Sequence, residues 1–312
     1  MVVAAFDGVA GGSETSMIGR YWLQGVILVL MGLAYLGTHH WAPGGTGMIP
    51  AGITQQLATA EPTPRPTATP APTPIGIGGT VTITVVYDNN AYDPRLSTAW
   101  GFSCLVELVE ERGKTTILFD TGGDGALLLS NMAILGLKPR AIDIVVLSHI
   151  HGDHTGGLAN VLAASDRPIV YLPRSFPKDF KDRVQAQTEL RQVSEPQAIA
   201  SGVYTTGEMG SGIIEQALIL KTAKGLVVIT GCAHPGIVNM VRKAREIGND
   251  DPYLALGGFH LGGASQKEIE GIIADFQELG VQKVAPCHCT GEKAIALFRE
   301  VYGEGFIENG VG

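Results

Sequence analysis

The chain has 312 residues, of which 45% are hydrophobic, 17% charged and 6% aromatic, and its formal net charge is -8. This composition excludes collagen-like, coiled-coil and wholly disordered proteins. The acidic balance argues against a nucleic-acid partner, and four cysteines are too few for a disulfide-stapled scaffold of this length.

The first quarter of the chain differs from the remainder. After an N-terminal segment, residues 1–20, the run 21–37 (YWLQGVILVLMGLAYLG) has Gln24 as its only strongly polar side chain. A bilayer-spanning helix needs about 20 apolar residues, so this run is nearly long enough, and aromatic residues flank it. We expect an uncleaved transmembrane signal anchor, with a cleaved signal peptide or a buried core helix as the alternatives.

Residues 38–75 are expected to be a linker. Within it, EPTPRPTATPAPTP contains six prolines and four threonines, a composition that favours an extended polyproline II spacer. Arg20 precedes the apolar run, and no basic residue lies between that run and Arg65, which places the N-terminus inside. We therefore predict a membrane-anchored protein whose folded domain is extracytoplasmic. Secretion after signal cleavage is the alternative.

Residues 76–312 are predicted to form one α/β domain. Strands are expected over 80–87, 103–110, 115–119, 142–147, 168–172, 218–222, 225–230 and 281–285, and helices over 126–137, 158–164, 266–279 and 292–301. The helix over 266–279 has the clearest limits, because Ser265 and Glu268 form a capping box and Gly280 ends the apolar face. Strand pairs followed by alternating strands and helices indicate a layered α/β fold.

The histidines of this domain carry its candidate chemistry. All six follow a predicted strand or lie in a turn rich in glycine or proline: His149, His151, His154, His234, His260 and His288. The first three belong to the motif SHIHGDH, together with Asp153, directly after the buried strand that ends at Leu147. Imidazoles two residues apart, followed by a carboxylate and a third imidazole, can supply ligands to two adjacent metal ions. A solvent-exposed polar loop is the alternative.

This motif resembles that of the metallo-β-lactamase superfamily of metal-dependent hydrolases, and the resemblance spans nearly all of residues 80–295. Asp120, in LFDTG, resembles the superfamily's first motif, a carboxylate that supports the metal-binding loop. The resemblance implies a four-layer αβ/βα sandwich. It also implies two metal sites, one formed by His149, His151 and His234, and the other by Asp153, His154 and His288.

Finer motifs are similar to those of a subgroup that includes dihydropterin ribofuranosylaminobenzene 5′-phosphate synthase. These motifs are DNN (88–90), WGFS (100–103), GCAHPG (231–236), GGFHL (257–261) and HCTG (288–291). The chain departs from many superfamily members where a Gly-Asp pair provides a bridging aspartate, because it has Gly231 and Cys232 there. Either the Cys232 thiolate is available to the metals or the bridge is absent. Cys287 and Cys289 flank the predicted ligand His288. They are expected to be either small buried thiols or further metal ligands.

The expected activity is hydrolysis of a small phosphorylated or ester-type substrate by a metal-bound hydroxide. The histidine-rich ligand set favours two Zn²⁺ ions, with Mn²⁺ or Fe²⁺ as alternatives. Asp153 is expected to orient the attacking water. His260 is expected to protonate the leaving group, although a ligand, substrate contact or structural role is also open. The alternative functions are a synthase-like transferase that joins a pterin to a ribofuranosylaminobenzene phosphate, and a membrane-tethered metal-binding sensor without turnover.

Overall fold

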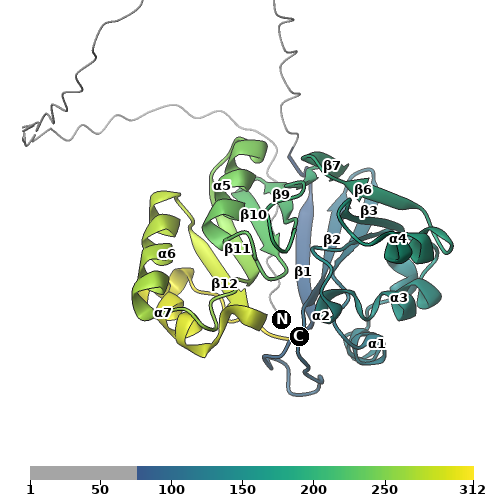
Figure 1. Cartoon of the computed structure of the whole chain (residues 1–312), viewed down its shortest axis with the longest axis horizontal. Coiled ribbons are helices and arrows are strands. Elements are labelled where there is room, and N and C mark those ends of the chain that lie inside the picture. Colours follow the sequence, from purple (N-terminus) through teal and green to yellow (C-terminus); the bar gives the residue numbers. More distant parts are fainter. Residues whose placement is uncertain (1–75) are drawn as a thin grey trace, which may run out of the picture. The chain divides into compact units, whose positions relative to one another are not determined.

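Twelve strands within residues 76–312, the part of the chain that this computed structural model describes, assemble into two six-stranded sheets (Figure 1). The first sheet has the order β1-β2-β3-β4-β5-β6. Its strands are β1 (Thr80–Tyr87), β2 (Ser103–Glu110), β3 (Gly113–Phe119), β4 (Ile144–Val146), β5 (Ile169–Pro173) and β6 (Leu190–Val193). Strands β1 to β3 pair antiparallel, whereas β3 to β6 pair parallel.

The second sheet has the order β12-β11-β10-β9-β8-β7. Its strands are β7 (Gln197–Ala200), β8 (Val203–Thr205), β9 (Leu218–Thr222), β10 (Gly225–Thr230), β11 (Pro252–Gly258) and β12 (Lys283–Cys287). Strands β7 to β10 pair antiparallel, and β10, β11 and β12 pair parallel. The carboxyl ends of these last three strands therefore meet at one edge of the sheet.

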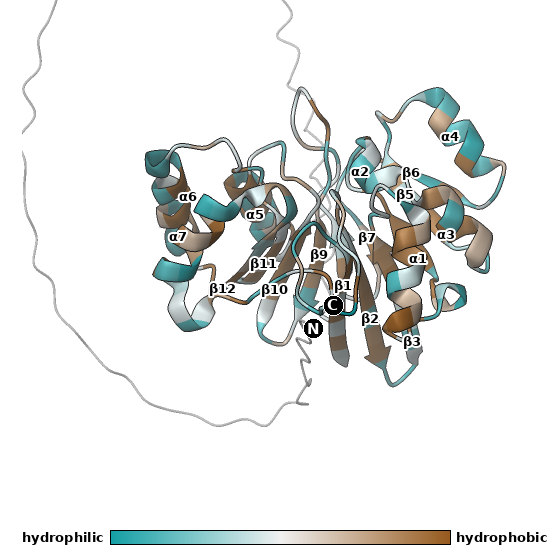
Figure 2. Ribbon diagram, turned by 90° about the horizontal axis from the view of Figure 1, so that it is seen from below, coloured by the Kyte–Doolittle hydropathy of each residue, from teal (hydrophilic) through white to brown (hydrophobic). Residues whose placement is uncertain are grey.

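The two sheets pack face to face with helices outside them. Alternating residues of β1, such as Val81 and Ile83, share one buried cluster with Leu220 of β9 and Val227 of β10. The outer face of the first sheet packs on α1 (Gly125–Ile134), α3 (Leu158–Ala164) and α4 (Lys178–Gln185), and that of the second on α5 (Ile237–Gly248), α6 (Gln266–Glu278) and α7 (Glu292–Tyr302). Figure 2 shows mainly hydrophobic strands and helices of mixed hydropathy. The α/β/β/α layering confirms the expected sandwich.

Several element boundaries differ from the expected ones. Helix α6 begins with the expected capping box, whereas α1 ends at Ile134 because Gly136 adopts a left-handed conformation with φ of 73°. Strand β4 is only three residues long, although an apolar run over 142–147 suggested six. Seven elements were not anticipated from the sequence: α2 (Gly152–Thr155), α4, α5, β6, β7, β8 and β11. Short 3₁₀ helices occupy Pro139–Ala141, His288–Thr290 and Gly303–Gly305.

The predicted segments at 1–20, 21–37 and 38–75 lie outside the described residues. Within residues 76–312, no helix combines the length and the hydropathy that crossing a bilayer requires. The hydrophobic N-terminal helix therefore stays a prediction from the sequence.

Candidate metal centre

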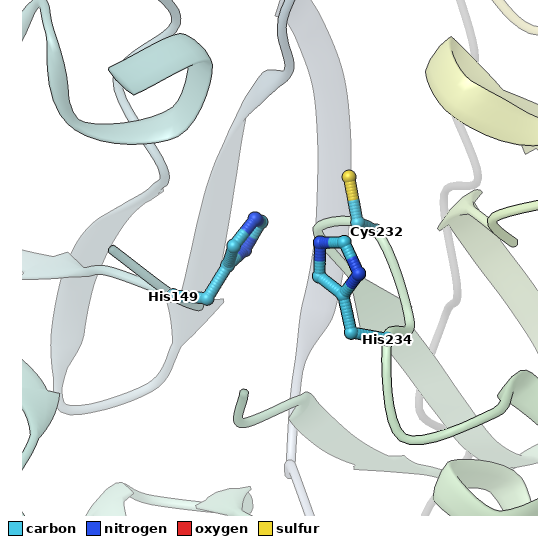
Figure 3. Close-up of side chains that lie close together, drawn as sticks. All are labelled: His149, Cys232 and His234. Carbon is cyan, nitrogen blue, oxygen red and sulfur yellow. The ribbon is translucent and has the colours of Figure 1, made fainter. Parts of the chain in front are cut away.

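The predicted histidines converge at the carboxyl ends of parallel strands. His149 and the short helix α2 (Gly152–Thr155) follow β4 of the first sheet, and a turn carrying Cys232 and His234 follows β10 of the second. Figure 3 shows His149 facing these two side chains from the opposite sheet. His288 follows β12. Segments almost 140 residues apart in sequence thus form one cluster between the two sheets.

Asp120 holds the loop that carries the first three histidines. It is fully buried, and its Oδ1 accepts a hydrogen bond from the backbone N–H of Ser148 at 2.7 Å. Its Oδ2 accepts from Oγ of Ser148 and from Nδ1 of His154, each at 2.7 Å. A Cβ on Gly231 would lie 2.2 Å from Oγ of Ser148, so glycine lets the turn after β10 approach this loop. Asp120 thereby directs the lone pair of Nε2 of His154 into the centre.

Three ligand atoms meet around His154. Its Nε2 lies 3.2 Å from Nε2 of His288, and Oδ2 of Asp153 lies 3.6 Å and 3.4 Å from these two nitrogens. Nδ1 of His288 donates to Oδ1 of Asn89 at 2.9 Å, so both Nε2 atoms present lone pairs to each other. Such an arrangement requires a cation or a proton between them. Ligand atoms at about 2.0–2.1 Å from a tetrahedral Zn²⁺ are about 3.3 Å apart, which matches this group.

A second group lies around His149. Its Nδ1 bonds Oγ of Ser148 at 2.9 Å, and its Nε2 lies 3.1 Å from Nδ1 of His151. The ring of His234 lies 4.8 Å and 4.9 Å from those of His149 and His151, measured between centroids. Nε2 of His234 is buried and has no hydrogen-bond partner among the described residues. A buried ring nitrogen without a hydrogen-bond partner, on an imidazole packed beside two others, is suited to bind a metal ion.

Burial keeps the imidazoles of His149 and His234 neutral. Desolvation, followed by the neighbouring imidazoles, lowers the pKa of His149 far below its usual range. Desolvation and His260 lower the pKa of His234 to about 4. Neutral imidazole is the form that binds metal. Neither side chain therefore has to lose a proton before it binds an ion at neutral pH.

The sulfur of Cys232 lies between the two groups. It is 3.3 Å from Nε2 of His154. Its Sγ forms one compact set with ligand atoms of His149 and His234, and another with those of His154 and His288, all within 4.8 Å of one another in each set. The structure therefore places the Cys232 thiol between the two histidine groups. This is the position where many superfamily members have a bridging aspartate.

Glu215, a residue that the sequence analysis missed, holds the turn after β10. It is fully buried, and its Oε1 accepts from the backbone N–H groups of Gly231, Cys232 and Ala233 at 3.1, 2.9 and 2.9 Å. Its Oε2 accepts from the N–H of His234 at 2.9 Å. Desolvation raises the pKa of this carboxyl. The only signal in the sequence was an acidic residue two positions before the apolar run 217–220.

Trp100 and His260 mark the solvent-facing side of the centre. The Trp100 side chain is 59% exposed, and its ring lies 4.7 Å from that of His288. His260 is exposed, and its ring lies 4.3 Å from that of His234. The hydrogen bond with Cys289 raises the pKa of His260. His260 and His288 both have left-handed backbones, with φ of 55° and 49°, a strained conformation that clusters at functional sites.

Comparisons with known proteins agree with this geometry. Residues 99–234 match the family model described as Metallo-beta-lactamase superfamily. A Methanocaldococcus jannaschii protein named 7,8-dihydropterin-6-methyl-4-(beta-D-ribofuranosyl)-aminobenzene-5'-phosphate synthase is 31% identical over 269 residues, which cover 72% of this chain and 92% of that protein. The crystal structure of Tm1679, a metal-dependent hydrolase of the beta-lactamase superfamily, is 30% identical, with a TM-score of 0.61 and coverage of 74% and 96%. The Bacillus subtilis protein YhfI shares the fold, at 14% identity, a TM-score of 0.52 and coverage of 73% and 93%.

Proposed function

The chain belongs to the metallo-beta-lactamase superfamily, and we propose that it is a metal-dependent hydrolase of small phosphorylated or ester-type substrates. The observation that carries this proposal is the convergence of Nε2 of His154, Nε2 of His288 and Oδ2 of Asp153 within 3.6 Å of one another. These three atoms form a preorganised set of electron-pair donors, next to a second set around His149.

The donor types fit Zn²⁺. His149, His151 and His234 would hold one ion, and Asp153, His154 and His288 would hold the second, with Cys232 between them. Imidazole, carboxylate and thiolate all suit Zn²⁺, whereas Mn²⁺ and Fe²⁺ are alternatives that tolerate the sulfur less well. Ions bound there would polarise a scissile carbonyl or phosphoryl group and activate water at neutral pH.

Asp153 is the residue that we assign to orienting the attacking water. Its side chain is 24% exposed, and its Oδ2 faces both His154 and His288. Although partial burial opposes ionisation, the neighbouring imidazoles of His288 and His154 lower the pKa of Asp153 to about 2. The group is therefore a carboxylate at neutral pH, able to accept a hydrogen bond from water and to aim it at the substrate.

A second candidate is the synthase activity for which the M. jannaschii relative is named. The 31% identity over most of both chains favours it. It would use the same metal-binding residues, so the two activities differ in substrate and not in the machinery described above.

The decisive experiment presents the full chain with two kinds of substrate. Chromogenic phosphodiester, phosphomonoester, lactone and β-lactam compounds test hydrolysis, and the substrates in the relative's name test the synthase. We expect chelator-sensitive turnover of at least one ester that is abolished in His149→Ala. The same turnover should persist in Glu246→Gln, a change on the exposed face of α5. Product formation with the synthase substrates alone would move the assignment to the second candidate.

We further propose, from the sequence of residues 1–75, that the run 21–37 anchors the protein in a membrane with the domain at 76–312 extracytoplasmic. Fractionation of cells that express the full chain should find it with membranes, and deletion of 21–37 should release it. Protease added to intact cells or spheroplasts should digest the domain. Protection of the domain would reverse the proposed orientation.

A further inference from the structure

A third group of ligand atoms adjoins the two histidine groups. Cys232 follows β10, His260 follows β11 and Cys289 follows β12, three adjacent parallel strands whose carboxyl ends share one edge. The two sulfur atoms and one ring nitrogen of His260 lie within 4.8 Å of one another. Both cysteines are buried free thiols, whereas His260 is exposed. The three side chains therefore form a compact group of two buried soft donors and one exposed imidazole.

The backbone around this group is fixed by local contacts. A Cβ on Gly258 would lie 2.7 Å from Sγ of Cys289 and 3.2 Å from Cα of Cys232, so glycine lets the two cysteines approach each other. The N–H of Gly262 donates to the carbonyl of Cys289 at 3.2 Å. The N–H of Phe259 donates to Oγ1 of Thr290 at 3.0 Å. These two bonds tie the turn after β11 to the turn after β12 on both sides of His260.

We propose that Cys232, His260 and Cys289 form a third metal subsite, selective for a thiophilic divalent ion such as Zn²⁺, next to the two histidine groups. Two thiolates and one imidazole make a sulfur-rich donor set, which favours Zn²⁺ over harder ions. Binding replaces two S–H bonds by two metal–sulfur bonds and releases two protons to solvent. The exposure of His260 leaves the solvent side for a fourth ligand, and Cys232 is shared with both histidine groups.

This assignment gives His260 a ligand role in place of the proton-donor role expected from the sequence. The ring lies 4.3 Å from that of His234, so it also lies on the solvent-facing side of the group around His149. The strained left-handed backbone at His260 is then explained, because it turns the imidazole back toward two cysteines on neighbouring strands.

Cobalt reconstitution of the full chain under reducing, oxygen-free conditions tests the subsite directly. Co²⁺ bound by thiolates gives an intense charge-transfer absorption, and metal analysis gives the number of ions per chain. We expect three ions and a strong thiolate band in the wild type. Cys289→Ser and His260→Ala should each retain two ions, with the band weakened most in Cys289→Ser because one sulfur is lost.

Cys287→Ser is the matched control, because Cys287 is a buried thiol two residues away that belongs to none of the three groups. It should keep three ions and the full band. Two ions in the reduced wild type would overturn the proposal, as would an unchanged band in Cys289→Ser. Titration of fewer than four free thiols would show a disulfide in place of the subsite. If Cys289→Ser fails to fold, the exposed His260→Ala variant carries the test. Hydrolysis assays are independent, since three ions without turnover would contradict only the proposed function.

Discussion

Two turns of the centre are each held by a buried carboxylate, but in different ways. Asp120 contacts a side chain that faces the ligand cluster, because it accepts from Nδ1 of His154 as well as from Ser148. Glu215 accepts hydrogen bonds from backbone alone, from the four consecutive N–H groups of residues 231–234, although its Oε2 also lies 4.0 Å from Nδ1 of His149. Asp120 therefore determines how one imidazole presents its lone pair, whereas Glu215 determines the path of the chain. The first should govern metal affinity and the second stability.

Removal of Glu215 should have the largest effect on folding. In Glu215→Ala, three buried N–H groups and the half-buried N–H of His234 lose their acceptor, and at about 1 kcal/mol each the free energy of unfolding should fall by about 4 kcal/mol. Glu215→Gln keeps one acceptor oxygen and should lose less. Chemical denaturation of metal-free protein measures both variants. Equal stability of Glu215→Ala and wild type would contradict the proposal that Glu215 governs stability while Asp120 governs metal affinity.

Asp88 is a third buried carboxylate, and it lacks such a set of donors. Its Oδ1 accepts from the N–H of Asn90 at 2.6 Å, while its Oδ2 is buried without a partner among the described residues. Burial raises the pKa of Asp88 from 3.8 to about 6. The folded state thus binds the proton more tightly than the unfolded state, so this group stabilises the fold below pH 3.8. Its contribution is lost as the pH rises to about 6.

Asp88→Asn should therefore stabilise the protein at pH 7. The pKa difference corresponds to about 3 kcal/mol, and the variant should lack the decline in stability between about pH 4 and pH 6. Asp143→Asn is the control, because Asp143 also accepts a backbone N–H, from Thr116 at 2.8 Å, but is exposed. It should not raise the stability at pH 7. A destabilised Asp88→Asn at pH 7 would show that its ionised form is required by the fold.

Asp120→Asn should affect metal binding more than folding. An amide nitrogen at the position of Oδ2 cannot accept from His154 and Ser148, so the imidazole loses the partner that sets its tautomer. Loss of such a partner typically costs 10- to 100-fold in metal affinity or activity. Ser148→Ala, which keeps the bond between Asp120 and His154, should cost less. Competition with a chromogenic chelator measures both affinities, and a reversed order would contradict the role given to Asp120.

Exposed ion pairs should have the smallest effect. Arg183 pairs with Asp179 at 2.8 Å on α4, and both side chains are largely exposed. Because solvent screens such pairs, Asp179→Ala should leave both stability and metal affinity at the wild-type level. Thermal unfolding of Asp179→Ala, measured in parallel with the Glu215 variants, compares the sizes of the two effects on stability.

Local patterns in the sequence predicted the first half of the centre better than the second. The motif at 148–154 lies within seven residues, and the carboxylate Asp120 follows a strand that is easily recognised. Glu215 acts on a turn sixteen to nineteen residues away, and its neighbours give no periodic signal. Strands β6 and β7 were missed because they are four residues long and expose two or more side chains, so alternation cannot be recognised. The contact between Cys232 and Cys289 depends on the pairing of three strands.

The position of Trp100 allows the centre to be followed by tryptophan fluorescence. It is the only tryptophan in residues 76–312, and its ring lies 4.7 Å from that of His288. Indole emission responds to solvent exposure, to a nearby imidazolium and to paramagnetic ions. With Trp22 and Trp41 replaced by phenylalanine, indole excitation therefore gives an intrinsic optical reporter beside His288, through which the arrival of an ion or a substrate can be timed without any attached dye.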